Sequence, residues 1–235
     1  MSSNRVALIT GASQGLGKAI AEEYAKHGYN LVLVGRNKNK LEALSRELTK
    51  YAVAIIIKVC DISSVSQLLE MTDSLENTNI DILVNCAGAF PVKKISDMSL
   101  KEYDECMQVN VRAPFLLIRE LSRNMIKNRW GRIINIASSS AYGGAPLTSV
   151  YCASKHALLG LSRSLYKELK DDNIRVLCVS PGSIKTEMGR EVEKLGQIFD
   201  TFMEPTEVAK YVVYNSSFDG NMVAEEIRLN RVFVQ

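Results

Sequence analysis

A glycine-rich turn between a strand-like run and a helix-like run limits the possible folds more than any other feature. Residues 5–10, RVALIT, form a short β-branched apolar run, and residues 15–27 place apolar side chains at helical spacing. Between them the sequence reads TGASQGLG, with three glycines. Glycine suits positions where a chain turns tightly, approaches a ligand or packs a helix against a sheet. Strand, loop and helix in this order predict the first unit of an α/β fold.

The glycine turn also predicts a dinucleotide site. Its spacing, G-x-x-x-G-x-G, is a variant of the G-x-G-x-x-G fingerprint, and it has the strand before and the helix after that this fingerprint requires. Backbone N–H groups at the start of the helix would face a pyrophosphate. The residues expected to contact the dinucleotide here are Gly11, Ser13, Gln14, Gly15, Leu16 and Gly17.

The residues after the second expected strand, Asn30–Val34, bear on the choice of dinucleotide. An acidic residue there would accept hydrogen bonds from both ribose hydroxyls, whereas an arginine accommodates a 2′-phosphate. This chain has Arg36, with Lys38 and Lys40 close behind. We therefore predict NADP(H) in preference to NAD(H), which stays possible. The competing interpretation is a solvated basic loop, because Gln14 supplies no second cation from the glycine turn.

Strand-like and helix-like segments alternate along the rest of the chain, which predicts an α/β fold with a mostly parallel sheet. The further expected strands are Ala52–Val59 (fully apolar and buried), Ile80–Val84, Gly131–Ala137, Ile174–Val179 and Glu226–Leu229. The further expected helices are Leu41–Tyr51, one opened by a capping box at Ser99–Glu102 and running to about Asn128, one from Tyr151 to about Lys170, and one opened by Pro205.

Asp61 and Ile62 follow the third expected strand, at the carboxyl edge of the sheet. Asp61 could accept a hydrogen bond from an adenine amino group. It could equally cap the next helix together with Ser63 or Ser64. The residues alone leave both interpretations open.

Small residues follow the fourth expected strand, in the run Asn85-Cys86-Ala87-Gly88. They would let the backbone pass close to another strand or to a ligand. Further along, Asn110 is a polar residue in an apolar stretch, and Pro114 removes one helical N–H near it. Asn110 then either holds a water at a kink or satisfies a freed carbonyl.

Tyr151 and Lys155 stand four residues apart, so that on a helix both side chains lie on one face. A unit charge at ~4 Å with an effective dielectric of ~20 contributes ~4 kcal/mol, which would lower a tyrosine pKa by roughly three units. Such a phenol could exchange a proton at neutral pH. The alternative is a surface helix with a solvated lysine. The preceding strand delivers Ser138, Ser139 and Ser140 to the same edge of the sheet.

Taken together, these motifs resemble the short-chain dehydrogenase/reductase family over essentially the whole chain. The resemblance implies a three-layer, doubly wound Rossmann fold whose mostly parallel seven-stranded sheet has the order 3-2-1-4-5-6-7. It implies one domain over residues 1–235, with a substrate loop or lid at 183–204. One departure is Cys86, where many relatives have a second asparagine.

The resemblance also implies residue roles. Tyr151 would be the proton donor and acceptor, Lys155 would lower its pKa and bind the nicotinamide ribose, Ser138 would orient the substrate carbonyl, and Asn110 would hold a relay water. The remaining cofactor contacts expected are Arg36, Asp61, Ile62, Asn85, Ala87, Gly88, Tyr151, Lys155, Pro181, Gly182, Ile184 and Thr186. No metal site is expected.

The resulting hypothesis is an NADP(H)-dependent oxidoreductase that interconverts a small carbonyl compound and a secondary alcohol. The alternative is a 3-oxoacyl-acyl-carrier-protein reductase, although residues 221–235 lack the Thr-Gly and Gly-Gly elements typical of those relatives. A non-catalytic NADP(H) sensor is a third interpretation, but such proteins usually lose the tyrosine or lysine. Epimerases and dehydratases share the Tyr-x-x-x-Lys pattern and are usually longer.

Composition narrows the possible partners. The 235 residues are 46% hydrophobic and carry a net charge of +3 without a basic run, which gives no reason to expect nucleic acid or a membrane. With no long apolar run and no signal-like segment, we expect a cytoplasmic protein. The five cysteines are expected to be free thiols, most of them buried.

Two segments bear on assembly and access. The helix with Tyr151 offers a packable face of small and apolar residues, which together with the resemblance predicts a homotetramer or homodimer. This face comprises Ala153, Ala157, Leu158, Gly160 and Leu161. Residues 187–203 contain several apolar side chains and could form a mobile lid or an amphipathic helix over the core.

Overall fold

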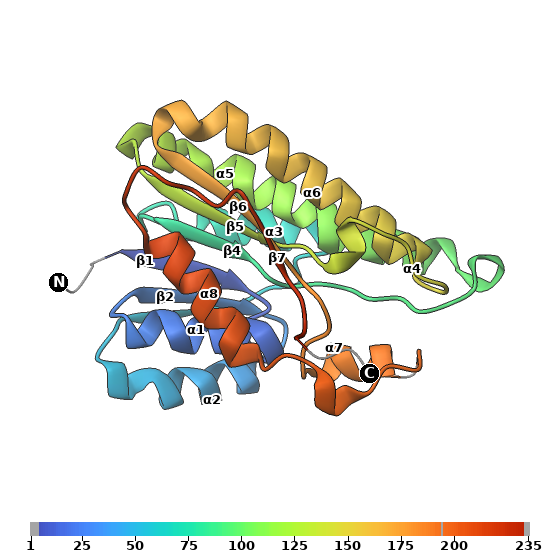
Figure 1. The fold of residues 1–235 in the computed structure, drawn as a ribbon. Coiled ribbons are helices and arrows are strands. Elements are labelled where there is room, and N and C mark those ends of the chain that lie inside the picture. The colour runs from blue at the N-terminus through green and yellow to red at the C-terminus, as the bar shows by residue number, and fades with distance from the viewer. Residues whose placement is uncertain (1–4, 194, 233–235) are drawn as a thin grey trace.

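A computed structural model describes residues 5–193 and 195–232; the domain predicted over residues 1–235 therefore extends a few residues beyond them. Seven strands form one sheet in the order β3-β2-β1-β4-β5-β6-β7. Every neighbouring pair is parallel. Helices cover both faces, with α1, α2 and α8 on one side and α3, α5 and α6 on the other (Figure 1). The predicted three-layer Rossmann fold and its strand order are confirmed.

The strands are β1 (Val6–Thr10), β2 (Asn30–Gly35), β3 (Ile55–Val59), β4 (Ile82–Asn85), β5 (Gly131–Ile136), β6 (Ile174–Pro181) and β7 (Glu226–Leu229). The helices are α1 (Gly15–Lys26), α2 (Lys38–Leu48), α3 (Val65–Asp73), α4 (Leu100–Met107), α5 (Ala113–Asn128), α6 (Ser149–Leu169), α7 (Glu187–Glu193) and α8 (Pro205–Ser217).

The prediction for the third strand was wrong in length and burial. The segment expected to be buried from Ala52 to Val59 is extended only over Ile55–Val59, and Val59 is 53% exposed. Ala52 has a left-handed backbone, with φ at 54°, which ends the extended run on that side. Because β3 is the outermost strand, one of its edges has no neighbour, and its apolar residues are covered incompletely.

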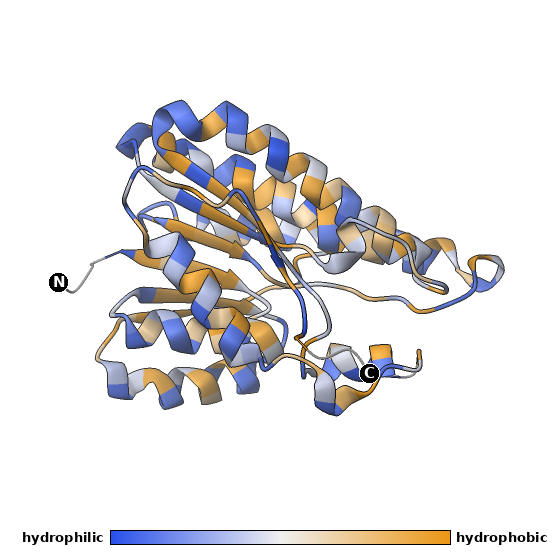
Figure 2. Ribbon diagram, viewed as in Figure 1, coloured by the Kyte–Doolittle hydropathy of each residue, from blue (hydrophilic) through white to orange (hydrophobic). Residues whose placement is uncertain are grey.

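Successive residues of each strand enter different cores, as the alternation of a strand requires. Ala7 and Ile9 of β1 pack in the core formed with α1 and α8, whereas Leu8 between them packs in the core formed with α3 and α5. Hydrophobic strands therefore lie between helices whose outer faces are hydrophilic (Figure 2). This burial on both faces explains why the inner strands are almost entirely apolar.

The capping box predicted at the start of α4 is present, with Ser99 and Glu102 bonded reciprocally. The predicted disturbance around Asn110 is also present. Between α4 and α5 the chain passes through a π-helical turn, Gln108–Arg112, in which the N–H of Ala113 donates to Gln108 O. Pro114 has no N–H for the carbonyl four residues back, so regular α-helical bonding cannot continue there.

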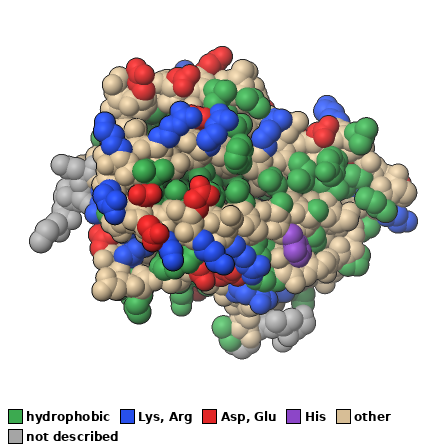
Figure 3. All heavy atoms as spheres, turned by 90° about the horizontal axis from the view of Figure 1, so that it is seen from above, with side chains coloured by type: hydrophobic (Ala, Val, Ile, Leu, Met, Phe, Trp, Pro, Cys, Tyr) green, Lys and Arg blue, Asp and Glu red, His purple; other side chains and the backbone are tan. Residues whose placement is uncertain are grey.

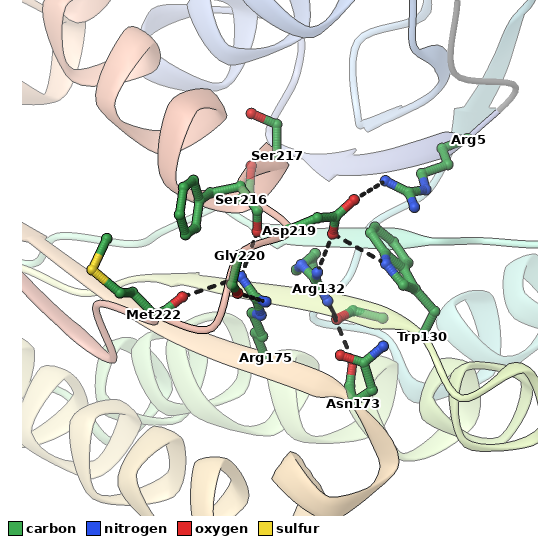
Figure 4. A network of polar contacts seen from close by, with 12 residues as sticks. Arg5, Trp130, Arg132, Asn173, Arg175, Ser216, Ser217, Asp219, Gly220 and Met222 are labelled. Carbon is green, nitrogen blue, oxygen red and sulfur yellow. Dashed lines mark hydrogen bonds and ion pairs between the residues drawn. The ribbon is translucent and has the colours of Figure 1, made fainter. Parts of the chain in front are cut away.

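At the amino edge of the sheet, a polar network fastens the loop between α8 and β7 (Figure 4). Asp219 in this loop accepts hydrogen bonds from Arg132 at 2.6 Å, Arg5 at 3.1 Å and the Trp130 indole at 3.3 Å. The guanidinium carbons of Arg5 and Arg132 lie 3.7 and 4.2 Å from the centre of the Trp130 ring. Arg175 donates to the carbonyls of Phe218 and Gly220 in the same loop.

The five cysteines are free, as predicted, and Cys60, Cys106, Cys152 and Cys178 are buried. Cys86 is partly exposed. Within residues 5–193 and 195–232, no helix has the length and apolar character needed to cross a membrane.

Candidate active site

A cavity of about 760 Å³ lies at the carboxyl edge of the sheet, where residues following strands β1 to β6 meet. Open parallel sheets bind ligands at this edge. The predicted site residues that line it are Gly11, Ser13, Gln14, Gly15, Leu16, Gly17, Arg36, Asp61, Ile62, Ala87, Gly88, Ser138, Tyr151, Lys155, Pro181, Gly182, Ile184 and Thr186. Asn85 and Asn110 are the two predicted site residues outside its lining.

At Gly11 and Gly17 of the glycine turn, the surrounding atoms leave no space for a side chain. Gly11 has φ at +69°, and a Cβ on it would lie 2.9 Å from Ala87 Cα. A Cβ on Gly17 would lie 2.3 Å from Gly11 O, which is far closer than atoms can pack. No side chain caps the start of α1 at Gln14. The first N–H groups of this helix are therefore available to an anion in the cavity.

Thr10, which the sequence did not single out, ties the turn to the neighbouring strand. Its hydroxyl accepts hydrogen bonds from the N–H groups of Cys86 at 3.0 Å and Ala87 at 3.1 Å. These bonds hold the chain after β4 against the end of β1. The available signal in the sequence was a threonine as the last residue of an otherwise apolar strand, directly before the first glycine of the turn.

Of the basic residues after β2, some line the cavity and one does not. Arg36 and Lys40 line the cavity together with Asn37, and Lys40 Nζ donates to Gln14 Oε1 at 2.8 Å. Lys38 is absent from the lining, and its ammonium lies 3.7 Å from Glu42. Of the two lysines considered with Arg36, only Lys40 is therefore placed to contact a ligand.

Asp61 shapes the turn before α3 but does not cap this helix. Its Oδ1 accepts hydrogen bonds from the N–H and hydroxyl of Ser63, at 3.0 and 2.8 Å, whereas Ser64 supplies the helix cap. Because Asp61 also lines the cavity, a contact with adenine stays a prediction.

The two asparagines lie behind the cavity and support it. Asn110 Oδ1 accepts from Ala89 N at 2.8 Å, and Asn110 Nδ2 donates to Ala89 O at 2.9 Å and to Ser154 Oγ at 2.9 Å. Its side chain thus holds the backbone after β4 against α6. Asn85 donates to Asn135 Oδ1 at 2.8 Å, in the neighbouring strand β5. The proposed relay water at Asn110 stays a prediction.

Tyr151 and Lys155 lie side by side on α6 and both line the cavity. They are 7% and 4% exposed, which excludes the surface-helix alternative. Lys155 Nζ donates to Ile136 O at 2.7 Å and lies 5.6 Å from the centre of the Tyr151 ring. On another side, the Phe90 ring packs edge-on against Tyr151 with 4.5 Å between centroids. Phe90 was not foreseen, because nothing in the sequence marks it as a neighbour of Tyr151.

The predicted lowering of the Tyr151 pKa was wrong for the chain by itself. Burial raises the pKa of Tyr151 to about 12, and a hydrogen bond with the Ser138 side chain only partly opposes this. Burial also lowers the pKa of Lys155 to about 8, with no carboxylate among the groups acting on it. The sequence argument counted the attraction between cation and phenolate and omitted the cost of burying either charge, which here is larger.

Residues 187–203 border the cavity and do not form an amphipathic helix over the core. Gly189 is the one buried residue of α7. The cavity lining from this segment comprises Glu187, Met188, Gly189, Val192, Leu195 and Gln197. The described residues of the segment therefore border the site; their role as a mobile lid stays a prediction.

The chain matches the family model for short chain dehydrogenases over residues 5–195. It belongs to the short-chain dehydrogenase/reductase family. The predicted membership is confirmed.

Known proteins similar to the chain include two curated reductases. It is 38% identical to the 3-oxoacyl-acyl-carrier-protein reductase FabG of Rickettsia bellii over 79% of this chain and 75% of that protein. It is 33% identical to FabG of Aquifex aeolicus over 95% of this chain and 94% of that one. Among solved structures, a metagenomic short-chain oxidoreductase in complex with NADP is 30% identical, with a TM-score of 0.86 over 98% of this chain and 99% of that one.

Proposed function

We propose that this short-chain dehydrogenase/reductase is an NADP(H)-dependent enzyme that interconverts a carbonyl compound and a secondary alcohol, with Tyr151 as general acid and base. One observation carries the proposal: Ser138, Tyr151 and Lys155 line the same cavity as the glycine turn. A proton donor and a dinucleotide cradle that share one cavity suit hydride transfer with coupled protonation.

The residues present fit a nicotinamide dinucleotide. The glycine turn leaves space that a Cβ would fill, and the uncapped start of α1 offers N–H groups to a pyrophosphate. An ammonium has three donors, and among the described residues the Lys155 side chain gives one to Ile136 O. The others suit ribose hydroxyls.

When bound, the nicotinamide would supply the hydride. Ser138 would donate a hydrogen bond to the substrate oxygen, on which negative charge develops, and Tyr151 would give it a proton. The nearby Lys155 ammonium would stabilise the phenolate that remains. Because burial raises the pKa of Tyr151 to about 12, the phenol carries its proton at neutral pH and is in the form that acts as an acid.

The preference for NADP(H) rests on Arg36 and Lys40, the two exposed cations of the cavity lining. A guanidinium and an ammonium together suit a 2′-phosphate, and the solved NADP complex of the similar metagenomic enzyme is consistent with this. The test compares Michaelis constants for NADPH and NADH in the wild type and in Arg36→Ala. We expect NADPH to be preferred and the preference to fall in the variant; a clear wild-type preference for NADH would overturn the assignment.

The reaction is tested by following NADPH absorbance with a panel of ketones, 3-oxo esters and 3-oxoacyl thioesters. Oxidation of NADPH by at least one carbonyl compound is expected. Protein that binds NADPH but oxidises it with no member of the panel would favour the non-catalytic sensor instead.

A second candidate is reduction of 3-oxoacyl-acyl-carrier-protein, favoured by the similarity to the two FabG proteins. Residues 221–235 lack the Thr-Gly and Gly-Gly elements expected of that activity. The two candidates separate in the same panel, because a carrier-protein reductase should turn over the thioester far faster than simple ketones.

We also propose that the chain assembles as a homotetramer or homodimer through the outer face of α6. Ala153 and Gly160 are exposed there, whereas Leu158 of the predicted face is buried in the core. Hydrophobic side chains form groups on the side of the molecule where α6 lies (Figure 3). Light scattering should give a multiple of the 26.1 kDa chain mass, and a monomer would contradict the proposal.

A further inference from the structure

The residues after β7 reach from the sheet to the segment that borders the cavity. Figure 1 shows this part of the chain leaving β7 and running to the region of α7. Arg231 Nη1 donates to Thr201 Oγ1 at 2.7 Å, and Arg231 Nη2 donates to Gln197 Oε1 at 3.1 Å. One side chain from the end of the described chain therefore binds two residues of the segment at 195–202.

Gln197 connects this contact to the cavity. Its Oε1 also accepts a hydrogen bond from Ser183 Oγ at 2.8 Å, and both Gln197 and Ser183 line the cavity. Arg231 and Ser183 thus fix the same amide oxygen from two directions. Because a guanidinium is a charged donor, the hydrogen bond from Arg231 to Gln197 is charge-assisted.

An aromatic pair completes the attachment. The Phe202 ring is buried and lies 5.3 Å from the Phe199 ring. The guanidinium carbon of Arg231 lies 5.2 Å from the Phe202 centroid, and that of Arg190 in α7 lies 4.4 Å from the Phe199 centroid. The two rings are therefore flanked by two arginines, one from α7 and one from beyond β7.

One end of the segment is fixed independently of Arg231. Met203 N donates to Ser183 O at 3.0 Å, and Lys185 N donates to Met203 O at 2.9 Å. These backbone bonds fix the segment at Met203, whereas Gln197, which borders the cavity, is held through its side chain by Ser183 and Arg231. This difference makes the Arg231 contact the one whose loss would release residues 195–202 while leaving the fold in place.

We propose that Arg231 is a positioning residue that holds residues 195–202 over the cavity and thereby slows the dissociation of its ligand. The ligand taken here is NADPH, so this part rests on the proposed function. Arg231 itself is absent from the cavity lining and acts through Gln197.

The test uses the full chain with Arg231→Met and, as a matched control, Arg228→Met. Arg228 lies on β7, three residues away from Arg231. Its guanidinium packs on Tyr142 instead of on residues 195–202. Chymotrypsin cleavage after Phe199 and Phe202, followed by mass spectrometry, measures the opening of residues 195–202. Stopped-flow fluorescence measures NADPH dissociation.

In Arg231→Met, cleavage and NADPH dissociation should both rise about tenfold, the loss expected for a charge-assisted hydrogen bond, with a higher KM for NADPH and little change in kcat. Arg228→Met should match the wild type. Thr201→Val, which removes one acceptor without touching the arginine, should show a smaller increase in both rates. It also provides the same readout if Arg231→Met folds poorly by circular dichroism.

Cleavage and dissociation rates in Arg231→Met equal to those of the wild type would overturn the proposal, as would an equal rise in Arg228→Met. If the wild type binds no NADPH, the proposed function fails, and the cleavage pattern alone then decides whether Arg231 holds the segment.

Discussion

At both edges of the sheet burial lowers the pKa of a cation, to about 10 at Arg132 and to about 8 at Lys155, and the edges differ in the partners that this cation has. At the amino edge, Arg132 is buried, donates to Asp219 at 2.6 Å and to two backbone carbonyls, and lies over the Trp130 ring. At the carboxyl edge, Lys155 is equally buried, but its recorded acceptor is the neutral carbonyl of Ile136. The first edge is filled by side chains that pair with one another, although Arg132 Nε has no hydrogen-bond partner among the described residues; the second edge keeps a cavity of about 760 Å³.

Because of this difference, the amino edge of the sheet contributes to stability and the carboxyl edge contributes to function. An ion pair such as Arg132 with Asp219 offsets part of the cost of burial, so the amino edge contributes to holding β5, β6 and the loop before β7 together. A buried ammonium without a counter-ion has a lowered pKa and destabilises the fold. Such a residue is retained where a ligand or a reaction uses the charge.

The largest expected effect is at the carboxyl edge. Lys155→Met removes the buried cation while keeping the length of the side chain, and we expect turnover to fall by about a thousandfold, as for loss of a preorganised electrostatic group. The free energy of unfolding should not decrease. Steady-state kinetics and urea unfolding measure the two quantities; a variant that loses stability in proportion to its activity would remove the contrast between the edges.

At the amino edge, Arg132→Ala should lower stability and leave turnover unchanged. It removes one of the three donors to Asp219 and the Arg132 donor to the carbonyls of Gly131 and Asn173, so the free energy of unfolding should fall by about 3 kcal/mol. Activity per folded molecule should persist. Arg132→Met is the matched control, because it fills the volume and should lose less. Equal activity losses at both edges would contradict the comparison.

The pH dependence of stability should show the same contrast. The pKa of Lys155 is lowered by burial to about 8 in the folded chain, whereas an unfolded lysine keeps its ordinary value of 10.5. Below pH 8 both states hold the proton and the burial cost is complete; between pH 8 and 10.5 the folded state gives up its proton first, and stability is regained. Lys155→Met should therefore exceed the wild type by roughly 3 kcal/mol at pH 7, and by progressively less towards pH 10. A pH-independent difference, measured by urea unfolding, would show that Lys155 carries no such cost.

The smallest effect is expected at Arg5, a partly exposed member of the amino-edge network. Arg5→Ala removes one hydrogen bond to Asp219 and one cation on Trp130, and should cost less than about 1 kcal/mol at neutral pH. Burial alone would raise the pKa of Asp219, but the hydrogen bond and charge of Arg5 and the charge of Arg132 outweigh it, and the net pKa is lowered. The contribution of Asp219 is thus present above the ordinary value of 3.8 and is lost as the pH falls through the lowered one. Arg5→Ala should become less sensitive to acid between these values; an unchanged acid unfolding curve would exclude Arg5 from the network.

The carboxyl edge was largely predictable from the sequence, and the amino edge was not. Some residues can be recognised from the sequence because their spacing follows from backbone geometry that any chain of this fold must obey. They include Gly11, Gly17 and the Tyr151–Lys155 pair. Asp219 and Arg132 are 87 residues apart, and no local pattern links them. Long-range pairs of this kind depend on how the loops are placed, which short motifs do not encode.

The same limit applied inside the site. The sequence placed Asn85 and Asn110 near the ligand because they follow the pattern, yet their side chains are used to hold Asn135 and Ala89. It also gave Tyr151 a lowered pKa, because charge spacing can be read from a sequence and burial cannot. Arg231 could not be foreseen, since its partners lie 30 and 34 residues earlier.

The central claim is that Tyr151 gives its proton to a carbonyl compound as hydride arrives from NADPH in the cavity. The most direct test loads wild type and Tyr151→Phe with NADPH and mixes each with a carbonyl substrate in a stopped-flow instrument. We predict that the variant binds NADPH within about twofold of the wild type and transfers hydride at least about a thousandfold more slowly, the upper range for loss of a general acid. Hydride transfer at a rate close to that of the wild type would show that the proton comes from elsewhere and would contradict the account.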